Sequence, residues 1–265
     1  MNEADSDSTT EQKGSNTVKS VETSFAIVGA LEELDGGRVT EIARYTGLSK
    51  SSVHKHLATL LNHDFIVKQG GVYRLGLRFL DIGAMVREQR QGAQMIKESV
   101  KELAETSQEV GIFATEENGR SVVLYRESGR EGVRTKSRVG GRLYMHQTAA
   151  GKAILASLPD ERARQIIDTH GLPQATENTI TDKSELYEEL AQIRDRGLSF
   201  NMEESTKGLR AISAPVAGPN DTIVGACSIA SPSHRMRGEV FKQELPELLL
   251  GVVNGLELNL TYSST

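Results

Sequence analysis

The sequence predicts an α+β protein of two domains joined by a linker helix. Its 265 residues, 37% hydrophobic and 25% charged, have an ordinary globular composition and suffice for one large domain or two smaller ones. Apolar residues recur at helical spacing in the first part of the chain and then alternate in two short runs. Beyond residue 92 both patterns are interleaved, which favours helices covering a largely antiparallel sheet.

Composition and spacing divide the chain into four segments. Residues 1–17 contain no large apolar residue after Met1, so they cannot bury enough surface to offset the entropy of ordering. We expect a disordered tail over 1–17, a winged helix-turn-helix domain over 18–76, a linker helix over 77–92 and a second domain over 93–265.

The first domain is expected to open with a helix that ends at Gly36-Gly37. Apolar residues repeat along it at spacings of three and four, which predicts a single buried stripe. The stripe consists of Val21, Phe25, Val28, Leu31 and Leu34. A short second helix follows, with Thr40 as its cap and its end at Gly47, because glycine readily adopts the positive φ angle of a tight turn.

A third helix is expected to begin at once, with Ser49 as its N-cap. Its apolar face comprises Val53, Leu57, Leu60 and Leu61. The alternating runs 65–68 and 72–75 flank a turn that contains two glycines, and they predict a β-hairpin. Two helices joined by a short glycine-containing turn and followed by a hairpin form the winged helix-turn-helix layout.

The distribution of charge indicates what this domain binds. The whole chain has a net charge of −5, but residues 38–78 hold seven basic and two acidic residues, a local charge of +5 that leaves −10 for the rest. A compact basic segment attracts phosphates locally, while an acidic body suppresses wrong encounters. We therefore expect double-stranded DNA as a partner.

The candidate DNA contacts lie on the polar face of the third helix, at the start of the second helix and on the hairpin. Short hydroxyls, imidazoles and amines near a helix N-terminus suit base edges, and Lys and Arg suit phosphates. The candidates are Arg38, Thr40, Lys50, Ser51, Ser52, His54, Lys55, Lys68 and Arg74. A small packing module with a solvated basic face is the competing interpretation. No metal site is expected at His54 and His56, because residues i and i+2 do not share a helix face.

The second domain is expected to interleave strands and helices. The strands are predicted at 111–115, 121–126, 133–137, 211–216 and 223–230. The helices are predicted at 93–109, 148–157, 160–170, 184–196 and 238–260.

The helix that opens at Thr148 is a candidate anion site. Its first turn, Thr148-Ala149-Ala150-Gly151, presents free amides and a positive dipole end, and its small residues leave room for a carboxylate. Ser228 on a later strand could supply a hydroxyl partner. The same small residues would also allow a helix to pack closely on a sheet, and the sequence leaves both interpretations open.

Nothing in the sequence indicates catalysis, a cofactor or a metal. No Gly-x-Ser-x-Gly nucleophile elbow occurs, and Lys152 after Gly151 lacks the glycine spacing of a phosphate-binding loop. Cys227 is the one cysteine, so disulfides and cysteine-based zinc sites do not hold the fold together. No apolar run approaches the roughly 20 residues of a membrane span. We expect no enzyme activity, no membrane partner and a cytoplasmic location.

Three stretches carry a resemblance to a known family. They are TGLSKSSVHKHLATLLNHDFI in the winged half, GGRLYMHQTAAGKAILASLP at residues 140–159 and RGLSFNMEESTKGLRAISAPV at residues 196–216. With these stretches the sequence resembles the IclR family of transcriptional regulators along nearly all of its length. The resemblance implies a winged helix-turn-helix dimer, joined by linker helices to effector-binding domains of GAF-like architecture and commonly assembled as a dimer of dimers.

The resemblance also implies a position for the effector. Small organic acids or related metabolites would lie between the start of the helix at 148 and the facing strands. The implied residues are Leu143, Ala149, Ala150, Asn201, Leu209, Ala211, Ser228 and Ala230. Asn201 stands where the family commonly has an acidic residue, and Ala230 where a second hydroxyl can occur, so a less polar or differently oriented ligand is one consequence.

Together these observations predict a ligand-responsive transcriptional regulator. It would bind a palindromic operator as a homo-oligomer, either a dimer or a dimer of dimers, and respond to a small metabolite such as an organic or sugar acid. Two other classes stay open: a metabolite sensor whose N-terminal half contacts proteins, and an enzyme fused to a winged domain. The sequence does not distinguish a repressor from an activator.

Overall fold

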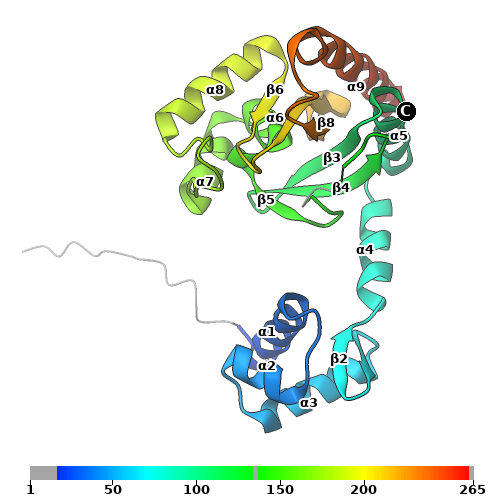
Figure 1. Ribbon diagram of the computed structural model, residues 1–265, viewed down its shortest axis with the longest axis vertical. Coiled ribbons are helices and arrows are strands. Elements are labelled where there is room, and N and C mark those ends of the chain that lie inside the picture. The colour runs from blue at the N-terminus through cyan, green and yellow to red at the C-terminus, as the bar shows by residue number, and fades with distance from the viewer. Residues whose placement is uncertain (1–16, 134–136, 263–265) are drawn as a thin grey trace, which may run out of the picture. The chain divides into compact units, whose positions relative to one another are not determined.

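The computed structural model describes residues 17–133 and 137–262 and divides into two compact units (Figure 1). Unit 1 is Met1–Val86 and unit 2 is Arg87–Thr265. The division falls inside helix α4 (Arg78–Glu88), within the segment expected as a linker helix. All but the last residue of the expected 1–17 tail lies outside the described residues.

Unit 1 is a winged helix-turn-helix domain, as predicted. Its elements before α4 are α1 (Lys19–Glu33), α2 (Val39–Thr46), α3 (Lys50–Asn62), β1 (Ile66–Gln69) and β2 (Val72–Leu75). The two strands pair antiparallel around Gly70-Gly71, and Gly37 bridges to Tyr73. The core of the unit lies where the three helices meet the hairpin, around Ile27, Ile42 and Leu57.

The buried face of α1 differs from the expected stripe. Ile27, Ala30 and Leu31 are buried, whereas Val21 is exposed and Phe25 is 68% exposed. The expectation holds for Leu31 but was wrong for Val21 and Phe25, because α1 has apolar residues on two faces and spacing alone does not tell which face α2 and α3 cover.

The cap of α2 also differs from the prediction. The N-cap is Arg38, and its amide donates to the carboxylate of Glu41 at 2.6 Å. Thr40 lies inside the helix. A carboxylate at the third helical position therefore satisfies the amide that precedes the helix, and the hydroxyl of Thr40 is not the cap.

Unit 2 is an antiparallel sheet with helices, so the α+β fold class is confirmed. Its strands are β3 (Val110–Glu117), β4 (Arg120–Ser128), β5 (Arg142–Tyr144), β6 (Ser199–Met202), β7 (Leu209–Ala217) and β8 (Ile223–Pro232). In the described part of the chain these strands follow the order β5-β4-β3-β8-β7-β6, and each neighbouring pair is antiparallel. The helices are α5 (Ala93–Ser107), α6 (Ala149–Ser157), α7 (Asp160–His170), α8 (Lys183–Arg196) and α9 (Leu245–Tyr262).

Helices cover both faces of this sheet (Figure 1). Because side chains alternate along a strand, Phe113 of β3 packs with α5 and α9, while Ala114 packs with α6. In the same way, Ile229 of β8 packs with α5 and α9, while Ala226 packs with α6. The α6 face of the sheet therefore has small residues, and they leave space beside the start of α6.

Two strands were not predicted, whereas the last helical segment begins at 238, as expected. β5 and β6 are only three and four residues long and have mixed polarity, so alternation gives little signal. The last helix is preceded by a π-helical turn, Val240–Glu244. The strand expected at 133–137 lies mostly outside the described residues. Among the helices that the structure describes, none is long and apolar enough to cross a membrane.

Candidate functional site

The exposed face of α3 follows from the way its apolar face packs. Val53 and Leu57 are fully buried against the other helices of unit 1. The opposite face therefore points to solvent, and it exposes Lys50, Ser51, His54 and Lys55. Ser52 is half-buried, and its amide donates to the Ser49 hydroxyl at 3.1 Å, which confirms Ser49 as the N-cap.

A side-chain contact joins α3 to α1. The hydroxyl of Ser24 lies 2.9 Å from Nδ1 of His56, which stands on the flank of α3 that faces the core. Sequence reasoning considered His56 only as a metal ligand. This contact instead orients the exposed face of α3 with respect to the rest of the domain.

The hairpin of β1 and β2 is the wing of the domain. The side chain of Arg38 reaches its tip, and Lys68 and Arg74 lie on opposite faces of it. A Cβ built on Gly71, whose φ is +81°, would lie 3.2 Å from the guanidinium of Arg38, so Arg38 reaches the turn. Lys68 lies over the ring of Tyr73, its cross-strand partner, at 5.1 Å, and it therefore shares the face of Tyr73. Arg74 pairs with Val67 one position along, so it points to the other face of the hairpin.

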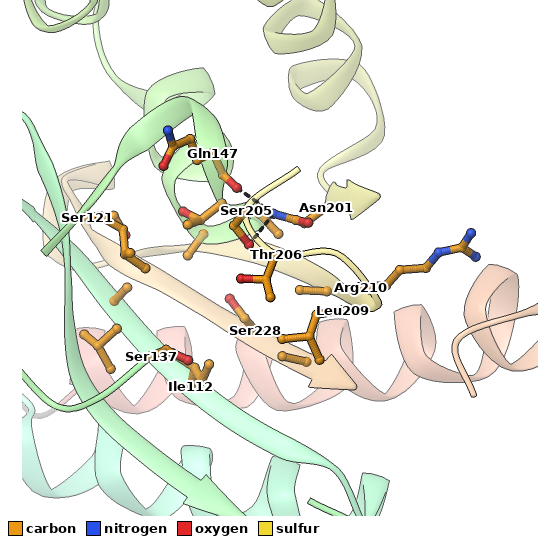
Figure 2. A pocket seen from close by; sticks show the side chains of 18 residues that line it. Ile112, Ser121, Ser137, Gln147, Asn201, Ser205, Thr206, Leu209, Arg210 and Ser228 are labelled. Atoms are coloured by element: carbon orange, nitrogen blue, oxygen red, sulfur yellow. Dashed lines mark hydrogen bonds between the residues drawn. The ribbon is translucent and has the colours of Figure 1, made fainter. Parts of the chain in front are cut away.

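A second candidate site is a cavity of about 150 Å³ in unit 2 (Figure 2). It lies between the small-residue face of the sheet and the start of α6. All eight residues implied by the resemblance line it: Leu143, Ala149, Ala150, Asn201, Leu209, Ala211, Ser228 and Ala230. The register explains how strand residues far apart in sequence meet, because Asn201 pairs with Ala211 and Ala211 pairs with Ala230.

The polar groups of the cavity are mainly uncharged. Thr148 caps α6 by accepting from the amide of Gly151 at 2.9 Å, which leaves the amides of Ala149 and Ala150 as the first donors of the helix. The hydroxyl of Ser228 donates to Ser213 at 2.9 Å, so it offers an oxygen acceptor rather than its proton. A carboxylate would thus be held by the amides and the helix dipole.

Arg210 lines the cavity with its stem but points its charge away (Figure 2). Its guanidinium donates to the carbonyl of Met236 at 3.0 Å and lies 3.9 Å from the carboxylate of Glu203. Among the described lining residues it is the one with a charged side chain. The cavity itself is therefore a largely neutral, apolar space.

Sequence reasoning missed about half of the lining. The missed residues are Ile112, Ala114, Ser121, Val123, Ser137, Gln147, Ser205, Thr206 and Arg210, whereas Thr148 was expected at the anion site. Ile112 and Ala114 could have been found from alternation, since they share one face of β3. Ser205 and Thr206 lie in an irregular segment, where no periodicity predicts orientation.

Burial shifts the pKa values of two titratable groups of unit 2. Burial lowers the pKa of His146 below its ordinary 6.5, and the nearby charges of Lys152 and Arg120 lower it further, while its contact with the Pro173 carbonyl at 3.1 Å raises it. Burial raises the pKa of the Cys227 thiol to about 12, so it stays protonated. Cys227 is therefore an inert core residue. Across 17–133 and 137–262, His, Cys, Asp and Glu form no group of three that could hold a metal ion.

Both units match models of one family. The model of the IclR helix-turn-helix domain matches residues 20–70, and the model described as "Bacterial transcriptional regulator IclR C-terminal" matches residues 88–255. The chain belongs to the IclR family of transcriptional regulators. This is a family of regulators and not of enzymes, so the chain is a DNA-binding transcriptional regulator with a C-terminal effector-binding domain.

Named relatives agree with this membership. The chain is 31% identical to a probable HTH-type transcriptional regulator ArcR of Halobacterium salinarum over 247 residues, which cover 92% of this chain and 94% of that protein. It is 29% identical to the transcriptional repressor IclR of Escherichia coli over 202 residues, 75% of this chain and 74% of that one.

Solved structures share the fold. The IclR structure from Thermotoga maritima covers 91% of this chain and 98% of its own, with a TM-score of 0.76 at 22% identity. An IclR homologue from Microbacterium hydrocarbonoxydans, complexed with 4-hydroxybenzoate, covers 89% of this chain and 98% of its own, with a TM-score of 0.73 at 22% identity.

Proposed function

We propose that this IclR-family regulator binds a palindromic DNA operator as a homo-oligomer and changes its affinity for that operator when a small organic acid occupies the cavity of unit 2. One observation carries the proposal: the same chain has both features that such a regulator needs. The helix α3 of unit 1 is capped and exposes a basic face, and unit 2 has a largely neutral cavity at the N-terminus of α6. A regulator of this kind acts on genomic DNA, and we place it in the cytoplasm on that ground.

The surface of α3 supports contact with a major groove. Lys50, Ser51, His54 and Lys55 form one exposed face, with Ser52 at its edge, and an α-helix fits the groove with such a face against the bases. We assign Arg38, whose guanidinium lies near the wing tip, to a phosphate beside the groove. Lys68 and Arg74 point to opposite faces of the hairpin. We therefore expect only one of the two to contact a phosphate in a given complex with DNA.

Exposed apolar residues of unit 1 support a homo-oligomer. Val18, Val21 and Phe25 form an uncovered face at the start of α1, with Phe25 68% exposed. Leu77 and Leu80, at the start of the α4 region, are exposed as well. A second copy of the chain is the occupant we propose, because a two-fold operator requires two recognition helices and a symmetric apolar interface supplies them.

The cavity supports a compact acid as effector. A space of about 150 Å³ is comparable to an engineered cavity of roughly that size that binds benzene. Apolar side chains such as Ile112, Val123 and Leu143 would surround the body of the ligand, and the amides of Ala149 and Ala150 would hold its carboxylate. A small acid with an apolar body therefore fits better than a sugar acid with many hydroxyls.

The experiment that tests DNA binding combines fragment recovery with salt dependence. DNA fragments that copurify with the full chain are sequenced, and the recovered operator is titrated at several salt concentrations. The logarithm of affinity should fall linearly with the logarithm of salt concentration, and Lys55→Ala should weaken binding and reduce the slope by about 0.9, as expected for one lost phosphate contact. Lys242→Ala, in unit 2, is the control and should leave both unchanged.

The same titration tests the effector. A set of small carboxylic acids, beginning with benzoate and 4-hydroxybenzoate, is added to the complex of protein and operator. Ala211→Leu fills the cavity from the sheet side, so it should keep DNA affinity and abolish the response to any acid that shifts the wild type. If no DNA is recovered, or if affinity for the recovered operator does not depend on salt, the proposal is wrong.

A further inference from the structure

Residues 203–208 connect β6 to β7 and form part of the cavity wall; we call them the pocket arm. Ser205 and Thr206 of the arm line the cavity, and Asn201 lines it from the end of β6 (Figure 2). The amide nitrogen of Asn201 donates to the carbonyl of Gln147 at 2.6 Å and lies 3.3 Å from the Ser205 hydroxyl. Asn201 thus links the arm to the segment that leads into α6 through its two hydrogen bonds.

Glu204 turns from the arm into the protein instead of toward solvent. It is only 5% exposed, although the residues on either side of it are more accessible. Its amide donates to Oδ1 of Asn201 at 3.0 Å, and its Oε1 accepts from the amide of Met202 at 3.2 Å. The arm therefore folds around this carboxylate.

The partner of Glu204 comes from the opposite wall of the cavity. Lys152 belongs to the first turns of α6, shortly after the lining residues Ala149 and Ala150, and is 1% exposed. Its Nζ lies 2.9 Å from Oε1 and 2.7 Å from Oε2 of Glu204. A buried ion pair thus joins the two elements that bound the cavity, 52 residues apart in sequence.

A buried ion pair contributes little to stability compared with apolar packing, because both charges lose their hydration. It does impose a defined geometry, since neither charge can leave the other without a new partner. We propose that the Lys152–Glu204 pair holds the pocket arm against α6 and so sets the shape of the effector pocket, which makes both groups positioning residues. The inference rests on the proposed function of the cavity.

The carboxylate of Glu189 lies near Lys152 and would allow the Lys152–Glu204 pair to open. Nζ of Lys152 is also 3.6 Å from Oε1 of Glu189 on α8, and the same oxygen accepts from Arg196 at 2.7 Å. If the arm moves, Lys152 keeps a negative partner. The arm can therefore separate from α6 without leaving Lys152 as an isolated buried charge.

Two threonine hydroxyls also hold the arm from its outer side. The hydroxyl of Thr179 donates to the carbonyl of Glu204 at 2.7 Å, and that of Thr176 donates to the carbonyl of Glu203 at 2.8 Å. These bonds are the alternative explanation for the position of the arm, and the experiment has to separate them from the ion pair.

The test measures hydrogen–deuterium exchange of the full chain, without effector or DNA. Lys152→Met and Glu204→Gln each remove one charge while keeping the side-chain length. We expect amides of the pocket arm and of the first turn of α6 to exchange about tenfold faster in each variant, because a local opening no longer breaks a charged contact. The double variant should exchange no faster than the singles, because the two groups act as one unit.

The controls isolate the position of the charge. Lys207→Met removes a lysine from the same arm, where it is 82% exposed and pairs with Glu177 at 3.2 Å, and it should change nothing. Amides of α9 should keep wild-type exchange in every variant. Glu204→Gln leaves Lys152 with Glu189, so it serves as the folded variant if Lys152→Met does not fold.

Three results would overturn the inference. The arm amides of Lys152→Met and Glu204→Gln could exchange at the wild-type rate, or exchange could be faster throughout unit 2. The third is that arm exchange is faster only in a Thr179→Val variant, which lacks the hydroxyl bond to Glu204. The outcome is separable from the proposed function. If the variants have a faster-exchanging arm but the protein binds no acid, the inference stands and the effector proposal is wrong. If the protein binds an acid but the variants have an unchanged arm, the effector proposal stands and the inference is wrong.

Discussion

At the scale of single residues, Glu204 and His146 are buried titratable groups of unit 2 with polar partners. Burial raises the pKa of Glu204, while Lys152 and the amide of Met202 act in the opposite direction. His146 shows the corresponding effect for a base, since burial lowers its pKa. Both groups lie beside the cavity and are not among its lining residues.

His146 predicts how the stability of unit 2 depends on pH. Its pKa is lowered in the folded chain, so between pH 6.5 and that lowered value the unfolded chain takes up a proton that the folded chain does not. The contribution of His146 is present in full above pH 6.5 and is lost as the pH falls.

Urea unfolding, followed by circular dichroism from pH 8 to pH 5, measures this effect. His146→Gln keeps a donor for the Pro173 carbonyl but does not titrate, so the variant should lose less stability than the wild type across the interval. Stability curves that run parallel for the two proteins would show that His146 does not titrate differently on folding.

At the scale of elements, the recognition helix depends on a cap and on the contacts of its buried face. The Ser49 hydroxyl accepts from the amide of Ser52, and Val53 and Leu57 attach the helix to the core. The residues on the exposed face of α3 are not part of that core. Stability and DNA contact are therefore carried by different residues of one helix, and the two can be measured separately.

Two serines of this region make that separation testable. Ser49→Ala removes the cap and should destabilise unit 1 by about 1 kcal/mol. Ser51→Ala, on the exposed face, should change stability by less than about 0.5 kcal/mol. It should instead alter base preference in a selection from random DNA. Thermal unfolding and such a selection check both statements, and equal stability losses in the two variants would contradict the assignment of the cap.

At the scale of the whole molecule, the proposed function requires two copies of unit 1 on one operator and a cavity in unit 2 that biases their engagement. A ligand shifts such an equilibrium only through its different affinity for the two arrangements. The exposed apolar residues of α1 are the part of this scheme that one substitution can remove.

Phe25→Glu places a charge on the uncovered face of α1. Sedimentation should show a smaller species than the wild type, and operator affinity should fall because one recognition helix binds alone. Tyr262→Glu is the matched control, because Tyr262 is equally exposed but lies at the end of α9, and it should leave both measurements unchanged. A Phe25→Glu protein of wild-type size would place the interface elsewhere.

The sequence by itself determined the helix-turn-helix, the hairpin, the cap at Ser49 and the exposed face of α3, because all of these depend on neighbours a few residues apart. Its family resemblance also located eight residues of the cavity. Only the tertiary structure decided which face of α1 is buried, that Lys68 and Arg74 point apart, and that Lys152 meets Glu204. Local spacing tells which side chains share a face, but which face is covered, and which distant charge lies opposite, is set by the packing of elements that are remote in the chain.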